Sequence, residues 1–434
     1  MDAPRTRLPE ESRLLEKAAR YLPGGALGSY RFPDELAFVV GRAQGSKLYD
    51  TSGREYIDYL LGSGPMILGH AHPAVVAAVA AQLEKGTTYF LVNEPAILLA
   101  EEICRAVPCA DQVRFTTSGS EATFFALRLA RAYRQRDRIL KFEGGYHGNH
   151  DYALMSSTPR SPKAFPAAQP DSAGIPQVLE GEVLIAPYND LPTAEALLAA
   201  HGAELAAVIV EPFQRVIRPQ PGFLEGLRDL TRRHGIPLIF DEVVTGFRFA
   251  YGGAQEHYGV VPDLAAYGKI IGGGFPLAAV CGREAIMKSL DPGLEGKPEF
   301  VSQVGTLNGN PVAAAAGLAT LGELRKPGAY ERLFRTGAAL RDGLAALVKE
   351  AGVAAQVIGE APLFDVVFTD RPVLDYRAML TGDRALLRTF NDECLRRGVL
   401  KGSQKFYVSL AHTEADVERT LEAFRGALSA LGRG

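Results

Sequence analysis

The hydrophobic positions between about residue 111 and residue 241 alternate between short apolar runs and longer segments with one apolar face. Short apolar runs predict buried strands, whereas apolar residues that recur every three to four positions predict helices. The predicted strands are residues 113–117, 138–142, 206–210 and 237–241, and the predicted helices are residues 121–134 and 224–234. Strands that alternate with helices are typical of a mostly parallel sheet that helices cover on both faces.

The two ends of the chain follow other patterns. Near the N-terminus we expect a helix at residues 11–21, short strands at 37–41 and 46–50, and an apolar helix at 73–85. From residue 326 the order is α+β, with helices at 329–350, 384–397 and 414–431 and strands at 366–369 and 406–409. These patterns predict a large domain at 66–325 and a small domain made of residues 1–65 and 326–434.

Residues 158–176 interrupt the alternation. They carry five prolines among small polar residues, at positions 159, 162, 166, 170 and 176. A long irregular stretch within a compact domain is either a functional lid or disordered, and both interpretations stay open.

Composition excludes several classes of function. A chain of 434 residues with 47% hydrophobic and 22% charged residues suits a large globular enzyme subunit. The net charge of −3 provides no basic face for nucleic acid. No apolar run reaches membrane-spanning length, and the first residues, from Met1 to Arg7, lack the apolar core of a secretory signal. We therefore expect neither a nucleic-acid nor a membrane partner.

The four cysteines are scattered and too few for a disulfide framework in a chain of this length. They are Cys104, Cys109, Cys281 and Cys394. Their simplest role is that of small buried hydrophobic residues in a reduced, cytoplasmic protein.

Lys269 is the first candidate for chemistry. It lies among apolar residues such as Leu264, Ile270 and Ile271, and three glycines follow at 272–274. A free lysine has a pKa near ~10.4, so it is a nucleophile at neutral pH only when burial or an aldehyde partner removes its charge. The alternative, a surface lysine before a flexible turn, fits the apolar neighbours poorly.

Asp241 ends the predicted strand 237–241, and Glu242 follows it. Ligands of open α/β sheets lie beyond the carboxyl ends of the strands, where an acid can pair with a cationic group of the ligand. The alternative is an acid that only caps the next helix.

The turn Ser118-Gly119-Ser120-Glu121 joins a predicted strand to a predicted helix. Ser118 and Glu121 fit a capping box, and the free amides at the start of a helix suit a phosphate. By itself this pattern also fits an ordinary helix cap.

The run from Gly144 to Gly148 follows the strand 138–142 and contains Tyr146 and His147. Tyr146 could lay its ring over a planar cofactor, or it could be a core tyrosine. Two histidine pairs, 147/150 and 70/72, lack the supporting carboxylates or cysteines of a metal site, so we expect no metal.

Taken together, these residues resemble class III aminotransferases. The similarity rests on Ser118-Gly-Ser-Glu-Ala122, Tyr146-His-Gly148, Glu211-Pro212, Asp241-Glu-Val243, Lys269 and Gly305-Thr306. A closer resemblance, to the glutamate-1-semialdehyde 2,1-aminomutase subgroup, rests on residues 64–70, 141–148, 222–226, 241–248, 251–255, 305–311 and 408–414. The resemblance covers about residues 10–430 and implies the fold-type I architecture, with a mostly parallel seven-stranded sheet and a smaller α+β domain.

The resemblance also assigns roles. Lys269 would hold pyridoxal phosphate as a Schiff base and move the proton, and Asp241 would pair with the protonated ring nitrogen. The remaining cofactor contacts would be Ser118, Gly119 and Ser120 at the phosphate, Tyr146 and Val243 on the two ring faces, and Gln214 near the ring hydroxyl. Thr306 would reach the phosphate of a neighbouring subunit, which implies a homodimer with a shared active site. Arg31 would bind a substrate carboxylate.

The departures from the aminomutase pattern fall on the expected substrate side. Ser63 stands where the subgroup has a tryptophan, and the chain contains no tryptophan. Gln214-Arg215-Val216 replaces a motif with asparagine, Asn308 replaces a common serine, and residues 401–407 are shorter and basic. We therefore predict an intermolecular aminotransferase that transfers an amino group between an amine or amino acid, with β- and ω-amino acids among the candidates, and a keto acid, ketone or aldehyde. Arg31, Lys401 and Lys405 indicate that one substrate carries a carboxylate.

Other functions stay open on the sequence alone. The aminomutase is the first alternative, and racemase or decarboxylase chemistry follows because the same cofactor supports it. A protein that binds the cofactor without turnover is a different class, against which the intact set of Asp241, Lys269 and residues 118–120 argues.

Overall fold

The computed structural model describes residues 7–431. Residues 1–6 and 432–434 lie outside this range. The prediction that the first residues form no secretory signal, and the two ends of the predicted small domain, therefore fall partly outside the described residues. The described chain forms two compact units. The small unit comprises residues 7–72, Glu331–Asp370 and residues 382–431, and the large unit comprises Pro73–Tyr330 together with the short segment Arg371–Thr381.

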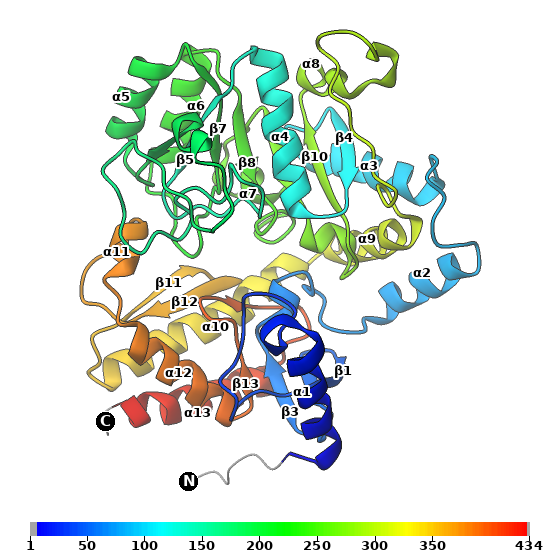
Figure 1. Ribbon diagram of the computed structural model, residues 1–434. Coiled ribbons are helices and arrows are strands. Elements are labelled where there is room, and N and C mark those ends of the chain that lie inside the picture. Colours follow the sequence, from blue (N-terminus) through cyan, green and yellow to red (C-terminus); the bar gives the residue numbers. More distant parts are fainter. Residues whose placement is uncertain (1–6, 432–434) are drawn as a thin grey trace. The chain divides into compact units, whose positions relative to one another are not determined.

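A seven-stranded sheet forms the centre of the large unit (Figure 1). Its strand order is β4-β10-β9-β8-β7-β5-β6. Strand β10 runs antiparallel to both neighbours, and the other adjacent pairs are parallel. The strands are β4 (Gln112–Thr116), β5 (Arg138–Phe142), β6 (Val183–Ala186), β7 (Leu205–Val210), β8 (Leu238–Asp241), β9 (Leu264–Tyr267) and β10 (Ala278–Gly282). This order confirms the predicted α/β class with a mostly parallel sheet.

Helices cover the sheet because its strands are apolar on both faces; β7, for example, is buried at every position. Helix α4 crosses one face and packs the buried Ala126, Leu127 and Ala130 against Ile209 and Ile239 of the sheet (Figure 1). The helices of this unit are α2 (Pro73–Leu83), α3 (Glu94–Ala106), α4 (Gly119–Arg134), α5 (Leu191–His201), α6 (Phe223–Arg233), α7 (Gly253–Tyr258), α8 (Glu284–Met287), α9 (Pro311–Leu324) and α11 (Tyr376–Leu380).

The proline-rich residues 158–176 pack onto the last strand of this sheet. Ala167 forms a bridge with Leu184 of β6, and the Ile185 amide donates to the Pro166 carbonyl at 3.0 Å. Ala168 is buried in the same core as α4. The segment thus covers a sheet edge that would otherwise expose unpaired backbone groups, a role that neither the lid nor the disorder interpretation included.

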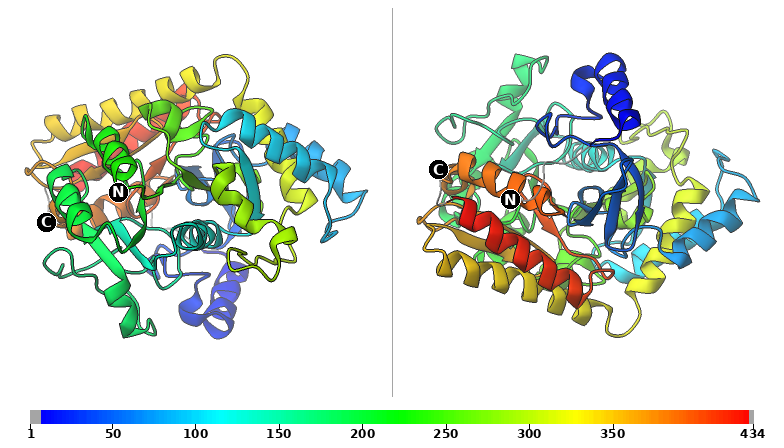
Figure 2. Two further views of the ribbon diagram at one scale, coloured as in Figure 1. Left: turned by 90° about the horizontal axis from the view of Figure 1, so that it is seen from above. Right: turned by 90° about the horizontal axis from the view of Figure 1, so that it is seen from below.

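The small unit joins the two ends of the chain. Strand β3 (Glu55–Asp58) pairs in parallel with β13 (Val399–Leu400), in a sheet that also holds β1 (Val40–Gln44) and β2 (Lys47–Asp50). A second sheet holds β11 (Gln356–Glu360), β12 (Leu363–Val367) and β14 (Phe406–Tyr407). The helices are α1 (Pro9–Tyr21), α10 (Ala329–Glu350), α12 (Arg384–Arg396) and α13 (Glu414–Leu431). Figure 2 shows α12 and α13 side by side.

Two predicted strands of the small unit are shifted along the chain. The strand predicted at 366–369 is β12, Leu363–Val367. Of the run predicted at 37–41, only Val40 and Gly41 lie in a strand, because β1 begins at Val40 and ends at a two-residue turn with Gly45 at φ +57°. Phe38 instead stacks on Tyr56, with ring centroids 4.8 Å apart. The Phe38 side chain therefore packs in the core of the small unit, although its backbone lies outside strand β1.

All four cysteines carry free thiols, three of them buried and Cys104 half-buried. Across residues 7–431, no helix is long and apolar enough to cross a membrane. The cytoplasmic location stays a prediction.

Candidate active site

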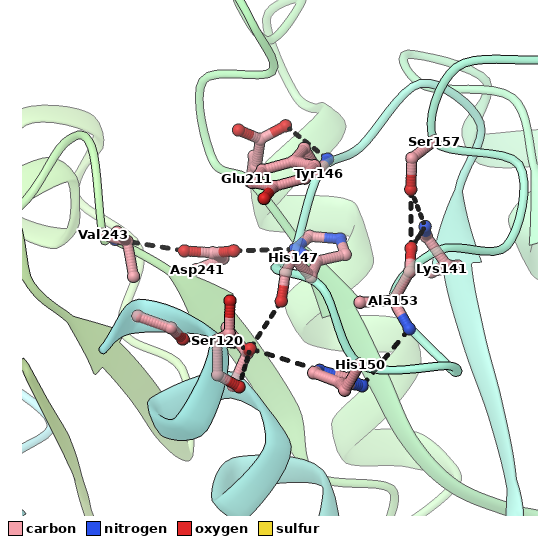
Figure 3. A network of polar contacts seen from close by, with 12 residues as sticks. Ser120, Lys141, Tyr146, His147, His150, Ala153, Ser157, Glu211, Asp241 and Val243 are labelled. Atoms are coloured by element: carbon pink, nitrogen blue, oxygen red, sulfur yellow. Dashed lines mark hydrogen bonds and ion pairs between the residues drawn. The ribbon is translucent and has the colours of Figure 1, made fainter. Parts of the chain in front are cut away.

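The carboxyl ends of β4, β5 and β8 each lead into one of the predicted cofactor motifs. Strand β8 ends at Asp241, β5 leads into the turn that carries Tyr146, and β4 leads into the start of α4. Figure 3 shows Ser120, Tyr146, His147, Asp241 and Val243 close together.

Asp241 is buried and held at both carboxylate oxygens. His147 Nδ1 donates to Asp241 Oδ2 at 2.8 Å, and the Val243 amide donates to Oδ1 at 3.1 Å (Figure 3). Asp241 is 5% exposed and His147 is 2% exposed, so both bonds lie away from bulk water. The carboxylate therefore has a fixed orientation at the end of the strand.

Val243 joins three of the predicted motifs through close packing. A Cβ on Gly119 would lie 2.8 Å from Val243 Cγ1, and a Cβ on Gly268 would lie 3.4 Å from that same atom. The same position at Gly268 is 3.9 Å from the Gly119 Cα. The structure thus brings the start of α4, the residues after β8 and the residue before Lys269 into contact.

Lys269 follows β9 and begins a short 3₁₀ turn, Lys269–Gly272. The lysine is half-buried and has a φ of +51°, a backbone conformation that non-glycine residues adopt only when the surroundings enforce it. Helix α9 packs closely against this turn, since a Cβ on Gly273 would lie 2.5 Å from the Ala316 carbonyl oxygen. The lysine backbone is therefore held by its neighbours.

The predicted capping box at the start of α4 is confirmed. Ser118 Oγ accepts from the Glu121 amide at 3.3 Å, and Glu121 Oε2 accepts from the Ser118 amide at 2.9 Å. The next amides, of Gly119 and Ser120, are the first of the helix and have no acceptor within it. Ser120 Oγ accepts from the Asn149 amide at 3.1 Å. This helix start can bind an anion such as a phosphate.

Two buried polar atoms beside this cluster have no hydrogen-bond partner within residues 7–431. They are Gln214 Oε1 and His147 Nε2. A Cβ on Gly145 would lie 3.4 Å from the first and 3.1 Å from the second, so both border the same glycine. Gln214 Nε2 is paired, since it donates to the Glu143 carbonyl at 2.8 Å. Buried polar atoms rarely stay unpaired, so this pair fits a ligand with polar ring substituents.

Tyr146 is 41% exposed and is fixed at both ends. Its amide donates to Glu211 Oε2 at 3.1 Å, and its hydroxyl donates to Asn149 Oδ1 at 2.9 Å. An aromatic face that is exposed yet held in place suits stacking on a planar ligand.

Lys141 is a residue of this region that the sequence interpretation missed. Its ammonium is fully buried on β5 and donates to Ala153 O at 2.7 Å and to Ser157 Oγ at 2.9 Å (Figure 3). It also donates to Met155 O at 2.7 Å. Burial lowers the pKa of Lys141 to about 7. It holds the loop that follows His147. An isolated lysine in an apolar strand is the only sequence signal for it.

Three of the four histidines in the two pairs have protein partners, whereas the buried Nδ1 of His72 has no hydrogen-bond partner within residues 7–431. His147 binds Asp241, His70 Nε2 lies 2.7 Å from Asp58 Oδ2, and His150 Nδ1 accepts from the Ala153 amide at 3.3 Å. The described part of the chain contains no group of three or more metal-binding side chains.

The remaining predicted site residues are Thr306, Arg31 and Ser63. Thr306 is exposed in the large unit, whereas Arg31 and Ser63 are exposed in the small unit, and Arg31 forms an ion pair with Asp34. Their substrate and cofactor roles stay predictions.

The interpretation of Lys401 as a cation for a substrate carboxylate was wrong. Its ammonium is buried, 2.6 Å from Asp365 Oδ1 and 2.9 Å from Asn391 Oδ1. A charge that a buried carboxylate already neutralises is not available to a ligand.

Comparison with known proteins identifies the family of the chain. The chain matches the class-III aminotransferase family over residues 31–428. It is 43% identical over 423 residues to glutamate-1-semialdehyde 2,1-aminomutase 2 of Brevibacillus brevis, covering 95% of this chain and 97% of that protein. The chain belongs to the class-III aminotransferase family.

Two solved structures are similar over nearly the whole chain. An omega-transaminase from Sphaerobacter thermophilus has a TM-score of 0.93 and 38% identity, with 98% of each chain covered. A glutamate-1-semialdehyde aminomutase from Pseudomonas aeruginosa has a TM-score of 0.88 and 29% identity, with 98% of this chain and 95% of that chain covered. The protein is therefore a pyridoxal-phosphate-dependent enzyme of fold type I, as its sequence predicted.

The packing of Gly119 on Val243 gives a test of the cofactor cluster. Gly119→Ala should weaken pyridoxal phosphate binding, because the added methyl group would displace Val243. Overpacking of this kind costs on the order of 1–3 kcal/mol, so we expect the dissociation constant to rise about tenfold. Absorbance titration of cofactor-free protein measures it. Gly322→Ala in α9 is the matched control, since a Cβ there meets nothing within 4 Å. Parental affinity in Gly119→Ala would contradict the placement of the cofactor beside Val243.

Proposed function

We propose that Lys269 carries the pyridoxal phosphate of this enzyme and that the chain moves an amino group to or from a carbonyl carbon. The observation that carries this proposal is the contact of Gly119, Val243 and Gly268, because it joins the phosphate turn, the residues beside Asp241 and the lysine turn. Bound pyridoxal phosphate supplies an electron sink that stabilises negative charge on the carbon next to the substrate nitrogen.

Each side chain of the cluster has a task that its environment supports. Lys269 would accept and return the proton at the substrate carbon through its amine, once that amine is free of the cofactor and uncharged. Asp241 would pair with the protonated ring nitrogen, for which its two existing hydrogen bonds orient it. Gly119 and Ser120 would bind the phosphate through amides, with Ser118 capping the helix. Tyr146 and Val243 would contact the ring faces, and Gln214 the ring hydroxyl.

Two overall reactions are compatible with transfer of an amino group to or from a carbonyl carbon. An aminomutase moves nitrogen within one molecule, whereas an aminotransferase releases one carbonyl product and binds a second substrate. The curated relatives at 41–44% identity are named as aminomutases, so we put the glutamate-1-semialdehyde 2,1-aminomutase reaction first, in place of the intermolecular reaction favoured on sequence.

The intermolecular aminotransferase is the second candidate. Specific observations favour it: Ser63 replaces the tryptophan of the aminomutase pattern, and the omega-transaminase is more similar in sequence, at 38%, than the solved aminomutase at 29%. A smaller side chain at position 63 would leave more room for a second substrate.

We also propose that two copies of the chain form a homodimer. The large unit exposes an apolar surface that consists of Tyr89, Phe90, Leu91, Val92, Val304 and Leu307. Asn310 Nδ2 donates to the Thr87 carbonyl at 2.7 Å and Asn93 Nδ2 to the Gly309 carbonyl at 3.0 Å, so the two loops form one continuous surface. Monomeric proteins rarely expose such patches. Thr306, the residue expected to reach a neighbouring subunit, lies within it.

The role of Lys269 predicts the spectrum of the enzyme. Lys269→Ala should abolish the visible absorption band of the cofactor-bound protein, because no other amine would replace it. Lys326→Ala, at an exposed lysine paired with Glu323, should keep the band. Borohydride reduction of the parent enzyme followed by peptide mass mapping should place the cofactor on Lys269. An unchanged band in Lys269→Ala, or modification of another lysine, would refute the assignment.

A single substrate separates the two overall reactions. Enzyme supplied with glutamate-1-semialdehyde alone should form 5-aminolevulinate over many turnovers if it is an aminomutase. An intermolecular aminotransferase should instead form dicarbonyl and diamine products, since the aldehyde group of a second substrate molecule can accept the amino group, and should form the amine of a keto acid when one is added. Product quantification by chromatography, with and without added keto acid, distinguishes them; carbon dioxide release or loss of chirality alone would contradict both.

The apolar surface predicts the size of the protein in solution. Light scattering should give twice the subunit mass, and Leu91→Asp with Val92→Asp should give monomers, because charges would be buried in the interface. Val178→Asp, at a residue that is 74% exposed elsewhere, should stay dimeric. A monomeric parent protein would refute the proposal.

A further inference from the structure

The segment Arg371–Thr381 belongs to the large unit, although the chain on both sides of it belongs to the small unit. It contains α11, the short helix that Figure 1 draws in orange. Asp375 caps this helix by accepting from the Ala378 amide at 2.7 Å. Asn189, which follows β6, donates to the Leu374 carbonyl at 2.8 Å. The segment is thus fastened to the large unit by its own hydrogen bonds.

Tyr376 of α11 packs directly on the turn that follows β5. The Tyr376 side chain is buried, and a Cβ on Gly144 would lie 2.5 Å from two of its ring atoms. Gly144 also has a φ of +85°, which disfavours any residue with a side chain. The close approach leaves this turn no room to shift toward α11.

Arg377 of α11 binds the same turn through a buried carboxylate. Its Nε donates to Glu143 Oε2 at 2.7 Å, and its Nη2 donates to Oε1 at 3.0 Å. Nη2 also donates to the Lys163 carbonyl at 2.6 Å, and the guanidinium lies 4.0 Å from the Phe165 ring centroid. The hydrogen bonds to Glu143 raise the pKa of Arg377, and this paired, fork-like geometry is the strong form of an Arg–carboxylate contact.

The opposite side of the turn is held by the loop after β7. Gln214 Nε2 donates to the Glu143 carbonyl, and Arg215 Nε donates to the Gly144 carbonyl, both at 2.8 Å. Glu211 accepts from the Tyr146 amide. The turn is therefore clamped between α11 and this loop, and the residues it presents are Tyr146 and His147.

We propose that Arg377 is a positioning residue of the active site: through Glu143 it fixes the turn that presents Tyr146 to the cofactor and His147 to Asp241. The proposal rests on the proposed function, since it takes the roles of Tyr146 and Asp241 from there. Arg377 acts at a distance, because its only contacts among the residues of this turn are with Glu143. Loss of the Arg377 side chain should therefore make the turn with Tyr146 and His147 more mobile and weaken cofactor binding, in addition to lowering the stability of the fold.

The first experiment compares Arg377→Ala and Arg377→Lys with the parent enzyme, each titrated with pyridoxal phosphate. In Arg377→Ala the dissociation constant should rise about tenfold, and the visible circular dichroism of the bound cofactor should decrease. Arg377→Lys should recover part of both, since it keeps the charge but lacks the fork. Arg13→Ala is the matched control, because Arg13 binds Glu10 with the same two-bond geometry, at 3.0 and 2.6 Å, in the small unit.

A merely structural ion pair would lower the melting temperature of cofactor-free Arg377→Ala and leave the affinity and the dichroism of the bound cofactor at parental values. That result would overturn the proposal. If Arg377→Ala fails to fold, the same two measurements on Arg377→Lys, the affinity for the cofactor and the dichroism of the bound cofactor, decide the question.

The second experiment separates this inference from the proposed function. Tyr146→Ala should itself change the dichroism, and Arg377→Ala should add little in that background, because both changes act on one turn. An unchanged dichroism in Tyr146→Ala would refute the role of Tyr146. A changed dichroism in Tyr146→Ala together with a full, additive effect of Arg377→Ala would refute the positioning role alone.

Discussion

The burial of the Asp241 carboxylate is the constraint on which the rest of the site depends. A carboxylate removed from water is strongly unfavourable unless hydrogen bonds or a cation compensate it. His147 and the Val243 amide each provide one hydrogen bond, yet an ionised carboxylate can accept about four. The proposed pairing with a protonated ring nitrogen would use one of the remaining acceptor positions, so cofactor binding and the fold would then depend on the same residue.

Glycines around this carboxylate allow the backbone segments of the site to pack closely together. Gly119 lets the start of α4 close on Val243, because a Cβ there would lie 2.8 Å from Val243 Cγ1. A Cβ on Gly268 would be in ordinary contact with the same atom, at 3.4 Å. Gly144 has a comparable function behind the ring of Tyr376, at a positive φ. Close packing at these points makes the site rigid, so its geometry is set by the backbone before any ligand binds.

Much of this could be predicted from sequence because the signals are local. Strand β5 and helices α10 and α13 were predicted with their observed bounds, since apolar periodicity and flanking glycines mark them clearly. The cofactor motifs also lie on contiguous residues at strand ends. Strands β9 and β10 were not predicted, because runs such as Ala278–Gly282 are small, short and without alternation. These residues form strands because they pair with strands that are distant in sequence; β10, for example, lies between β4 and β9.

The features that sequence could not predict are long-range ones. Lys401 looked like a free cation, but its partner Asp365 is 36 residues away and both are buried, so only the fold determines that its charge is neutralised. The sequence around Arg371–Thr381 also gives no sign that this segment belongs to the large unit. Helix α11 has only five residues, and Glu143, which binds Arg377, is 234 residues away in the sequence.

The division of residues between the two units bears on how such a family changes its reaction. The residues proposed for the cofactor, from Ser118 to Thr306, all belong to the large unit, whereas Arg31 and Ser63 belong to the small unit. The hydrogen bonds and close contacts described for Asp241, Gly119, Val243 and the Lys269 turn involve neither Arg31 nor Ser63. With the substrate roles predicted for Arg31 and Ser63, amino-group chemistry would be retained while the choice of substrate changes. Such a separation is consistent with relatives of one chain that carry the names of an aminomutase and a transaminase, at 43% and 38% identity. Selection for a new substrate would act on the small unit first, because changes at the buried carboxylate would cost both cofactor binding and stability.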